Sequence, residues 1–531
     1  MWGYLGIQKR NAKLSENGCG KFSSIDRESL DYIKSLGVSH VWYTGILRHA
    51  TASDECGCTP SSSDWVKGLA GSPYSITDYY DTNPYLADNP TERMSEFDQL
   101  VKRSHDAGLK VIIDFVPNHV ARDYTSFAMA NKQSNVISHL GQNDDSSVHW
   151  KSENDFLYYP GEQLVLPINN QTYSECPAKA SGNTYTHAPS VNDWYDTVKI
   201  NYCDYHTATW DKMLDIILFW AKRGVDGFRC DMVELVPAEF FNWLISRVKE
   251  EYPDIIFVAE VYQKNLYAKY IREVGFDLLY DKSGMYDSIR AIVEKNVNDD
   301  ATPVEAWQSC KMLTWNWQYL GDLQPHMLNF LENHDEQRFA SDFFGRDGAN
   351  CYAALCASLF FNRSSFMIYA GEEIGEKGMD NEGFSGVDGR TSIFDWWQPE
   401  SLQKLYRYIH GEASLDENEC EILERYRSLL NLASESPAMH KGSTYDLCYC
   451  NYDSHGFNVD RHFAFLRDCG DETYLVFCNF SNSTCNVNLR IPEHAFAWLE
   501  MEETEQFNHN QPIEIKVDPM NGCILRLCPM A

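Results

Sequence analysis

From residue 26 onward, segments with a helical spacing of apolar residues alternate with short, almost continuous apolar segments. Asp26 can cap the first predicted helix, whose inward face carries Leu30, Ile33 and Leu36, and Gly37 ends it. The same alternation recurs along the chain. We predict strands at residues 38–44, 110–116, 225–230, 255–258, 276–280, 327–331 and 365–369, and helices at 26–36, 92–107, 210–223 and 237–248. Strands that alternate with helices in this way are typical of a parallel sheet.

Two segments depart from this alternation. Residues 120–203 are rich in Asn, Ser, Tyr, Thr and Pro and have no clear period. They are too long for a loop within a compact domain, so we expect an inserted subdomain there. After about residue 435, short alternating strands follow one another without helices, which predicts a C-terminal antiparallel β-sandwich at 436–531. Residues 1–119 and 204–435 are then left to form the main domain.

Polar residues gather where the predicted strands end, and this favours one parallel-sheet fold over another. In a (β/α)8 TIM barrel such residues meet at the C-terminal face of the barrel. The alternative is a doubly wound open sheet, but no glycine-rich phosphate turn follows the first predicted strand. We therefore predict an α/β protein: a (β/α)8 TIM barrel with an irregular subdomain inserted after the third strand and a C-terminal antiparallel β-sandwich.

Charge and composition narrow the class of partner. A formal net charge of −32 argues against nucleic acid or an anionic membrane, and a neutral substrate fits better. Aromatic residues make up 14% of the chain, which suits stacking on the apolar faces of sugars as well as packing in a core. The 17 cysteines show no paired Cys-x-x-Cys framework for zinc. With no apolar segment long enough to span a membrane and no signal-peptide core, we expect a cytoplasmic protein.

The segment Gly227-Phe228-Arg229-Cys230-Asp231 places opposite charges at the end of a predicted buried strand. Residues i and i+2 of a strand point the same way, so Arg229 and Asp231 share a face. A cation beside Asp231 would keep the carboxylate ionised, as a nucleophile requires. Taken alone, the segment fits equally well with a structural ion pair that completes the strand.

Other predicted strands also end in charged or imidazole side chains. Together these strand ends carry Asn118 and His119, Arg229 and Asp231, Glu260, and His334 and Asp335. Three carboxylates in one cleft repel each other, which raises the pKa of at least one of them. A raised pKa is what a general acid requires, so the set indicates acid–base chemistry at the C-terminal face.

The motifs that carry these residues resemble the α-amylase family of retaining glycoside hydrolases, over most of the chain. The matching segments are residues 114–119 (Asp-Phe-Val-Pro-Asn-His), 227–231, 259–261 (Ala-Glu-Val), 330–335, the tyrosine-bearing loop at 73–80, and 368–373. Six such motifs in the family's order, each at its proper strand end, make a specific match. The inserted segment and the C-terminal β-domain also lie where the family has them.

The resemblance implies a role for each residue. Asp231 would be the nucleophile and Glu260 the general acid/base, while Asp335 would stabilise the transition state. The substrate-binding residues would be Tyr74, His119, Arg229 and His334, and Asp114 is expected to be structural, paired with a nearby cation. The implied reaction is double displacement without a required cofactor, at α-1,4-glucosidic bonds of starch, glycogen or maltooligosaccharides. A transglycosylase or isomerase-type relative, and a catalytically silent carbohydrate-binding or scaffold subunit, remain alternatives.

The sequence departs from the family pattern in two places, after the nucleophile and at the start of the chain. After the nucleophile this chain has Glu234-Leu235 where many starch-degrading members have Lys-His, which argues against endo-acting hydrolysis and against calcium. Asn118 nevertheless matches the family's calcium asparagine, so a structural calcium ion with Asn118 as ligand is an expectation to be tested. The family's first strand precedes a loop that resembles residues 16–20. Either residues 2–7 form it here, or the chain begins late and lacks part of it together with any signal sequence.

Overall fold

The computed structural model describes residues 11–125, 139–298, 302–380, 383–384, 386–504 and 507–527. Its main sheet is a curled parallel sheet of seven strands that neighbour each other in chain order. These are β1 (His40–Tyr43), β4 (Lys110–Phe115), β9 (Gly227–Cys230), β10 (Ile256–Ala259), β11 (Leu278–Tyr280), β12 (Met327–Phe330) and β13 (Ser365–Met367). Every strand predicted from residue 38 to 369 is present, and the barrel prediction is confirmed. The predicted first strand at residues 2–7 lies outside the described residues.

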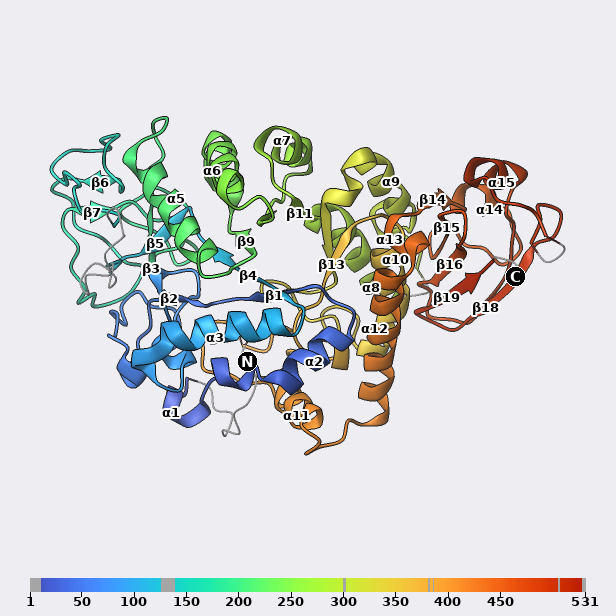
Figure 1. Cartoon of the computed structure of the whole chain (residues 1–531), viewed down its shortest axis with the longest axis horizontal. Coiled ribbons are helices and arrows are strands. Elements are labelled where there is room, and N and C mark those ends of the chain that lie inside the picture. Colours follow the sequence, from blue (N-terminus) through green and yellow to red (C-terminus); the bar gives the residue numbers. More distant parts are fainter. Residues whose placement is uncertain are drawn as a thin grey trace.

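Helices connect the strands and pack around them, as Figure 1 shows. The helices of the main domain are α1 (Leu14–Asn17), α2 (Arg27–Ser35), α3 (Arg93–Asp106), α5 (Ala208–Ala221), α6 (Ala238–Glu251), α7 (Tyr267–Lys269), α8 (Asp287–Asn298), α9 (Lys311–Leu320), α10 (Tyr352–Phe360), α11 (Glu400–Ile409), α12 (Glu417–Glu435) and α13 (Pro437–Lys441). The predicted cap of α2 is confirmed, since the Asp26 side chain accepts a hydrogen bond from the Ser29 amide at 3.0 Å. None of the described helices is long and apolar enough to cross a membrane.

The segment inserted after β4 lies at one end of the molecule (cyan in Figure 1) and is largely irregular, as predicted. Its strands form two short antiparallel pairs, β5 (His119–Ala121) with β8 (Thr197–Lys199) and β6 (Tyr158–Tyr159) with β7 (Ala178–Lys179). Another antiparallel pair, β2 (Leu47–His49) with β3 (Ile76–Thr82), lies between β1 and α3 in the chain. The register of β5 against β8 puts Lys199 directly opposite His119. This pairing brings a lysine to the strand end that carries Asn118.

The C-terminal strands lie at the opposite end of the molecule (red in Figure 1). A four-stranded antiparallel sheet runs in the order β14 (Ser443–Asp446), β15 (His462–Asp468), β16 (Thr473–Asn479) and β19 (Asn521–Arg526), and β17 (Cys485–Leu489) pairs with β18 (Ile513–Val517). Along β15, Phe463 and Phe465 join the core shared with the barrel helices, whereas Ala464 and Leu466 face the core of the C-terminal domain. The sheet is therefore buried on both faces, which the alternation of a strand allows.

Two short helices, α14 (Cys448–Asn451) and α15 (Glu493–Leu499), lie among these strands, so the expectation of strands without helices was wrong. β14 ends at Asp446, whose carboxylate accepts a hydrogen bond from the Cys448 amide at 2.7 Å and so turns the chain into α14. In α15, Phe496 and Leu499 are buried at helical spacing. All cysteines within the described ranges are free.

Candidate active site

The buried guanidinium of Arg229 links three carboxylates at the ends of neighbouring strands. Arg229 lies on β9, its side chain is 1% exposed, and its Nη1 contacts Asp231 Oδ1 at 2.8 Å. Its Nη2 lies 3.0 Å from Glu260 Oε2, just after β10, and Nη1 lies 3.7 Å from Asp114 Oδ1 on β4. The parallel register sets Asp114 beside Arg229, which explains the third contact. The predicted pairing of Arg229 with Asp231 is present, and Asp114 has the cationic partner expected for a structural carboxylate.

The proton affinity of Asp231 differs from the expectation that Arg229 would keep it ionised. Burial raises the pKa of Asp231 well above its ordinary value, and the nearby carboxylates of Glu260 and Asp114 raise it further. Arg229 lowers the pKa of Asp231, but its single positive charge is shared among three carboxylates. Burial prevails because one cation compensates only part of the negative charge that ionisation would create.

Glu260 behaves in the opposite way, although it is equally buried. Burial alone would raise the pKa of Glu260, but Arg229 together with hydrogen bonds from the Tyr262 hydroxyl and the Met232 amide lowers it below its ordinary value. The Tyr262 hydroxyl donates to Oε1 at 2.5 Å, and the Met232 amide donates to Oε2 at 2.9 Å. Such donors stabilise the ionised form of a carboxyl group. In the free protein, therefore, Glu260 holds a proton less tightly than Asp231 does.

Tyr74, His334 and Asp335 form a second group beside this cluster. The Tyr74 hydroxyl lies 2.7 Å from His334 Nε2, and the two rings stack with centroids 5.4 Å apart. His334 Nε2 also lies 3.1 Å from Asp335 Oδ2, and the Asp335 side chain is 39% exposed. The arrangement leaves an aromatic surface and an accessible carboxylate at the C-terminal ends of the strands. Such a pair can contact the apolar face and the hydroxyls of one sugar.

Sequence reasoning did not single out Trp42 or Tyr262, which both contact the cluster. Trp42 on β1 donates from Nε1 to Asp114 Oδ2 at 3.1 Å, and the Arg229 guanidinium lies 5.4 Å from its ring. The position of Trp42 near the end of a predicted strand was the available signal. For Tyr262 the signal was its place two residues after Glu260.

His119 contacts the inserted segment and the tyrosine-bearing loop. Its side chain is 4% exposed, and its ring lies 5.0 Å from that of Trp194 in the inserted segment. Burial lowers the pKa of His119 to about 4, although Asp196 and a hydrogen bond to the Tyr74 backbone oppose this. A neutral imidazole that touches the backbone of Tyr74 is suited to hold the tyrosine-bearing loop. Direct contact of His119 with a sugar stays a prediction.

The residues around Asn118 do not fit a calcium ion, which corrects the expectation of a metal ligand there. Asn118 Oδ1 accepts a hydrogen bond from Lys199 Nζ, which also donates to the backbone oxygen of Leu235 at 2.8 Å. Asn118 Nδ2 donates to the backbone oxygen of Gly182 at 3.0 Å. Calcium requires six to eight oxygen ligands. Here an ammonium group takes the oxygen atoms that a cation would need.

Chelation of divalent cations is accordingly expected to leave the stability of the protein unchanged. Excess EDTA and excess calcium should give the same Tm by circular dichroism, because Lys199 already donates hydrogen bonds to the oxygens of Asn118 and Leu235. As a positive control, Lys199→Met should lower the free energy of unfolding by about 1–3 kcal/mol, since it leaves the oxygens of Asn118 and Leu235 without a donor. A Tm that falls with EDTA and recovers with calcium would contradict this interpretation.

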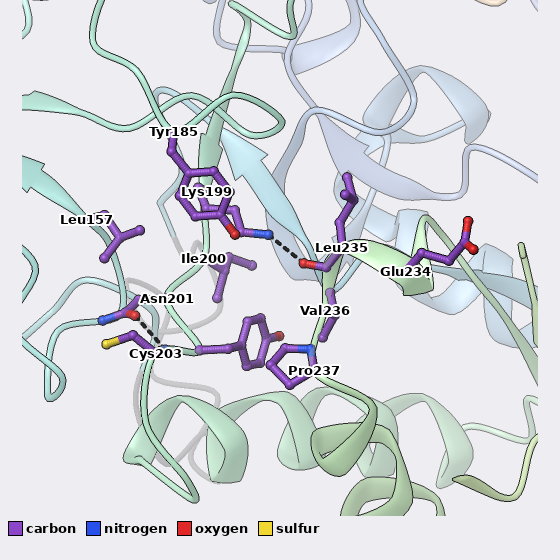
Figure 2. A pocket seen from close by; sticks show the side chains of 11 residues that line it. Leu157, Tyr185, Lys199, Ile200, Asn201, Cys203, Glu234, Leu235, Val236 and Pro237 are labelled. Carbon is purple, nitrogen blue, oxygen red and sulfur yellow. Dashed lines mark hydrogen bonds between the residues drawn. The ribbon is translucent and has the colours of Figure 1, made fainter. Parts of the chain in front are cut away.

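A cavity of about 290 Å³ lies between the inserted segment and the loop after β9. Figure 2 shows Tyr185, Lys199 and Leu235 around it, with the Lys199 ammonium directed at the Leu235 backbone oxygen. Lys199 Nζ also lies 5.2 Å from the centroid of the Tyr185 ring. Burial lowers the pKa of Lys199 to about 7. The carboxylate of Glu234 points away from the other labelled side chains in this view.

Comparison with known proteins identifies the family. The model of the α-amylase catalytic domain matches residues 9–442. Alpha-amylase 3 of Dictyoglomus thermophilum is 23% identical over 90% of this chain and 85% of its own length. Oligo-1,6-glucosidase of Bacillus cereus is 21% identical over 91% of this chain and 90% of its own length. The α-amylase of Geobacillus thermoleovorans in complex with acarbose superimposes with a TM-score of 0.63 at 18% identity, over 100% of this chain and 96% of that one. The chain belongs to the α-amylase family of glycoside hydrolases.

Proposed function

We propose that this protein is a retaining hydrolase that cleaves α-1,4-glucosidic bonds in starch, glycogen or maltooligosaccharides. Asp231 would act as the nucleophile and Glu260 as the general acid/base, with Asp335 stabilising the transition state. The observation that supports this most directly is the contact of one guanidinium with both carboxyl groups, at 2.8 and 3.0 Å. Retaining enzymes hold their two carboxyl groups about 5–5.5 Å apart, and inverting enzymes about 6.5–9.5 Å apart. Two carboxyl groups on one guanidinium favour the shorter separation.

In the first step Glu260 gives its proton to the glycosidic oxygen while an Asp231 oxygen attacks the anomeric carbon. The bond from that carbon to the leaving sugar breaks, and a glycosyl ester forms on Asp231. In the second step the ionised Glu260 takes a proton from water, and the resulting oxygen attacks the same carbon and releases Asp231. Two inversions give net retention. In the free protein Asp231 holds a proton more tightly than Glu260 does, whereas the reaction begins with the proton on Glu260. Substrate binding must therefore reverse this order of proton affinity.

The residues around the carboxylates would hold the sugar in place. Tyr74 and His334 would contact its ring and hydroxyls, and the exposed Asp335 would stabilise the positive charge that develops on the anomeric carbon. Relatives in the family carry different activity names, α-amylase in one case and oligo-1,6-glucosidase in another. The preference for α-1,4 bonds is therefore the part of the proposal that product analysis must decide.

Product analysis with maltoheptaose and soluble starch tests this function. We expect release of maltose or glucose, and proton NMR of the first products should show the α-anomer before it equilibrates in water. Products longer than maltoheptaose would instead identify a transglycosylase. Cleavage of panose only at its α-1,6 bond would overturn the proposed bond preference. A folded protein that turns over none of these substrates would favour the catalytically silent alternative.

A further inference from the structure

Glu234 ties the loop after β9 to the loop after β10. Its Oε2 accepts a hydrogen bond from the Tyr262 amide at 3.1 Å, and its Oε1 accepts one from the Gln263 amide at 3.0 Å. A carboxylate that binds two successive amides fixes the direction of the backbone that carries them. Figure 2 agrees with this role, since the Glu234 carboxylate points away from the cavity beside Lys199. Glu234 therefore serves the loop of the acid/base, although it follows the nucleophile by only three residues.

The loop that Glu234 holds carries a hydrogen-bond donor to Glu260. The Tyr262 hydroxyl donates to Oε1 at 2.5 Å, while Oε2 receives the Met232 amide at 2.9 Å. Met232 adopts a left-handed backbone conformation with φ 45°, which costs roughly 1–2 kcal/mol for a residue with a side chain. The strain is located where the chain turns an amide toward Glu260. Both oxygens of the acid/base are thus held by donors from the two loops that Glu234 joins.

Charged and titratable groups from the surrounding elements also face Glu260 or its direct neighbours. They are Arg229 on β9, Asp231 after β9, Asp114 on β4, Tyr280 on β11, and His334 and Asp335 after β12. These groups set the background potential of the site. The Tyr262 hydroxyl adds a directional contact to one oxygen of Glu260, and a substitution can remove that contact without changing any charge.

We propose that Glu234 and Tyr262 are positioning residues for the reaction: Glu234 orients the loop so that the Tyr262 hydroxyl stabilises the carboxylate that Glu260 becomes when it gives up its proton. The inference rests on the proposed role of Glu260 as acid/base. The Glu260 proton passes to the glycosidic oxygen and is regained from water, whereas Tyr262 keeps its own proton throughout. The hydroxyl stabilises the charged form more than the neutral one, so it makes Glu260 a stronger acid in the first step.

Because Glu260 holds its proton less tightly than Asp231 in the free protein, the pKa of Glu260 sets the acidic limb of kcat/KM. Tyr262→Phe removes only the hydroxyl and should raise the pKa of this limb on maltoheptaose by about one unit. Glu234→Gln loses one of the two acceptor oxygens and should shift the limb in the same direction by a smaller amount. The double variant should match Tyr262→Phe alone, because Glu234 acts through the tyrosine. Tyr205→Phe, whose ring is 69% exposed, and Glu239→Gln, also exposed, are matched controls that should leave the limb unchanged.

A purely structural role would lower Tm or total activity in Tyr262→Phe without moving the acidic limb, and this result would overturn the proposal. Additive shifts in the double variant would overturn the dependence of Glu234 on Tyr262. Infrared titration of the Glu260 carboxyl, identified by its loss in Glu260→Gln, gives a readout that needs no turnover. If Tyr262→Phe raises that pKa in a protein that cleaves no glucan, the contact stands and the proposed function fails. If the carboxyl titrates as in the wild type while glucan is cleaved, the positioning role fails and the function stands.

Discussion

Asp231→Asn is expected to reduce hydrolysis of maltoheptaose and soluble starch by at least about four orders of magnitude. Asparagine has nearly the same shape as aspartate, but its amide does not form the glycosyl ester. The protein should still fold, because burial already disfavours the charged form of Asp231, and a neutral side chain avoids that cost. The measurement is release of reducing sugar, followed by chromatography of the products, with Tm as the check of folding.

Two further variants make this experiment specific. Asp254→Asn changes an exposed aspartate just before β10 and should keep full activity. Glu260→Gln should lose activity on maltoheptaose but keep the first step on α-maltosyl fluoride, whose leaving group needs no proton. Asp231→Asn should be inactive on both substrates. An Asp231→Asn protein that hydrolyses starch at the wild-type rate would assign the nucleophile to another residue.

The second large effect is expected on stability, from replacing Arg229 by methionine. This change leaves Asp114, Asp231 and Glu260 buried without their shared cation and should lower the free energy of unfolding by about 3–5 kcal/mol. Loss of a cation raises the pKa of each carboxyl group in the folded state. Stability should then fall as pH rises through the carboxyl range, so the variant should differ least from the wild type in acid. Urea denaturation at several pH values measures both effects.

The comparison that isolates the shared contact is Arg229→Lys. Lysine keeps the charge but has one nitrogen in place of the fork that reaches two carboxylates, so part of the stability and little of the activity should return. Arg247→Met, at a side chain that is 54% exposed, should change stability by less than about 0.5 kcal/mol. Equal losses of unfolding free energy in Arg247→Met and Arg229→Met would show that the buried cluster contributes no more to stability than an exposed arginine does.

The residues at the strand ends could be predicted from the sequence better than any other part of the molecule. The strand that ends in Arg229 and Asp231 has a short apolar pattern, and its side chains alternate as the two-residue period requires. The same pattern located Glu260 after β10 and His334 after β12. These features depend on local sequence, which is why the barrel and the position of the carboxylates could be predicted.

Contacts that join distant segments could not be predicted. Lys199 lies 81 residues after Asn118 in a segment without periodicity, so its register beside β5 had no signal in the sequence. The proton affinity of Asp231 also depends on three-dimensional contacts, because Arg229 is shared with carboxylates from two other strands. Tyr262 required knowledge of how the loop after β10 bends back on Glu260. In each case the decisive partner comes from another element.

The four-stranded C-terminal sheet is buried on both faces, so the barrel helices depend on it to cover part of their apolar surface. Phe361, just after α10, contacts Phe463 at 4.5 Å and Phe465 at 5.1 Å between ring centroids. A barrel severed from β15 would present these aromatic surfaces to water and would tend to aggregate. A destabilising substitution far from the carboxylates, on the barrel-facing side of β15, would therefore reduce the yield of active enzyme. The C-terminal strands therefore cover an apolar surface of the barrel helices and are not a removable appendage.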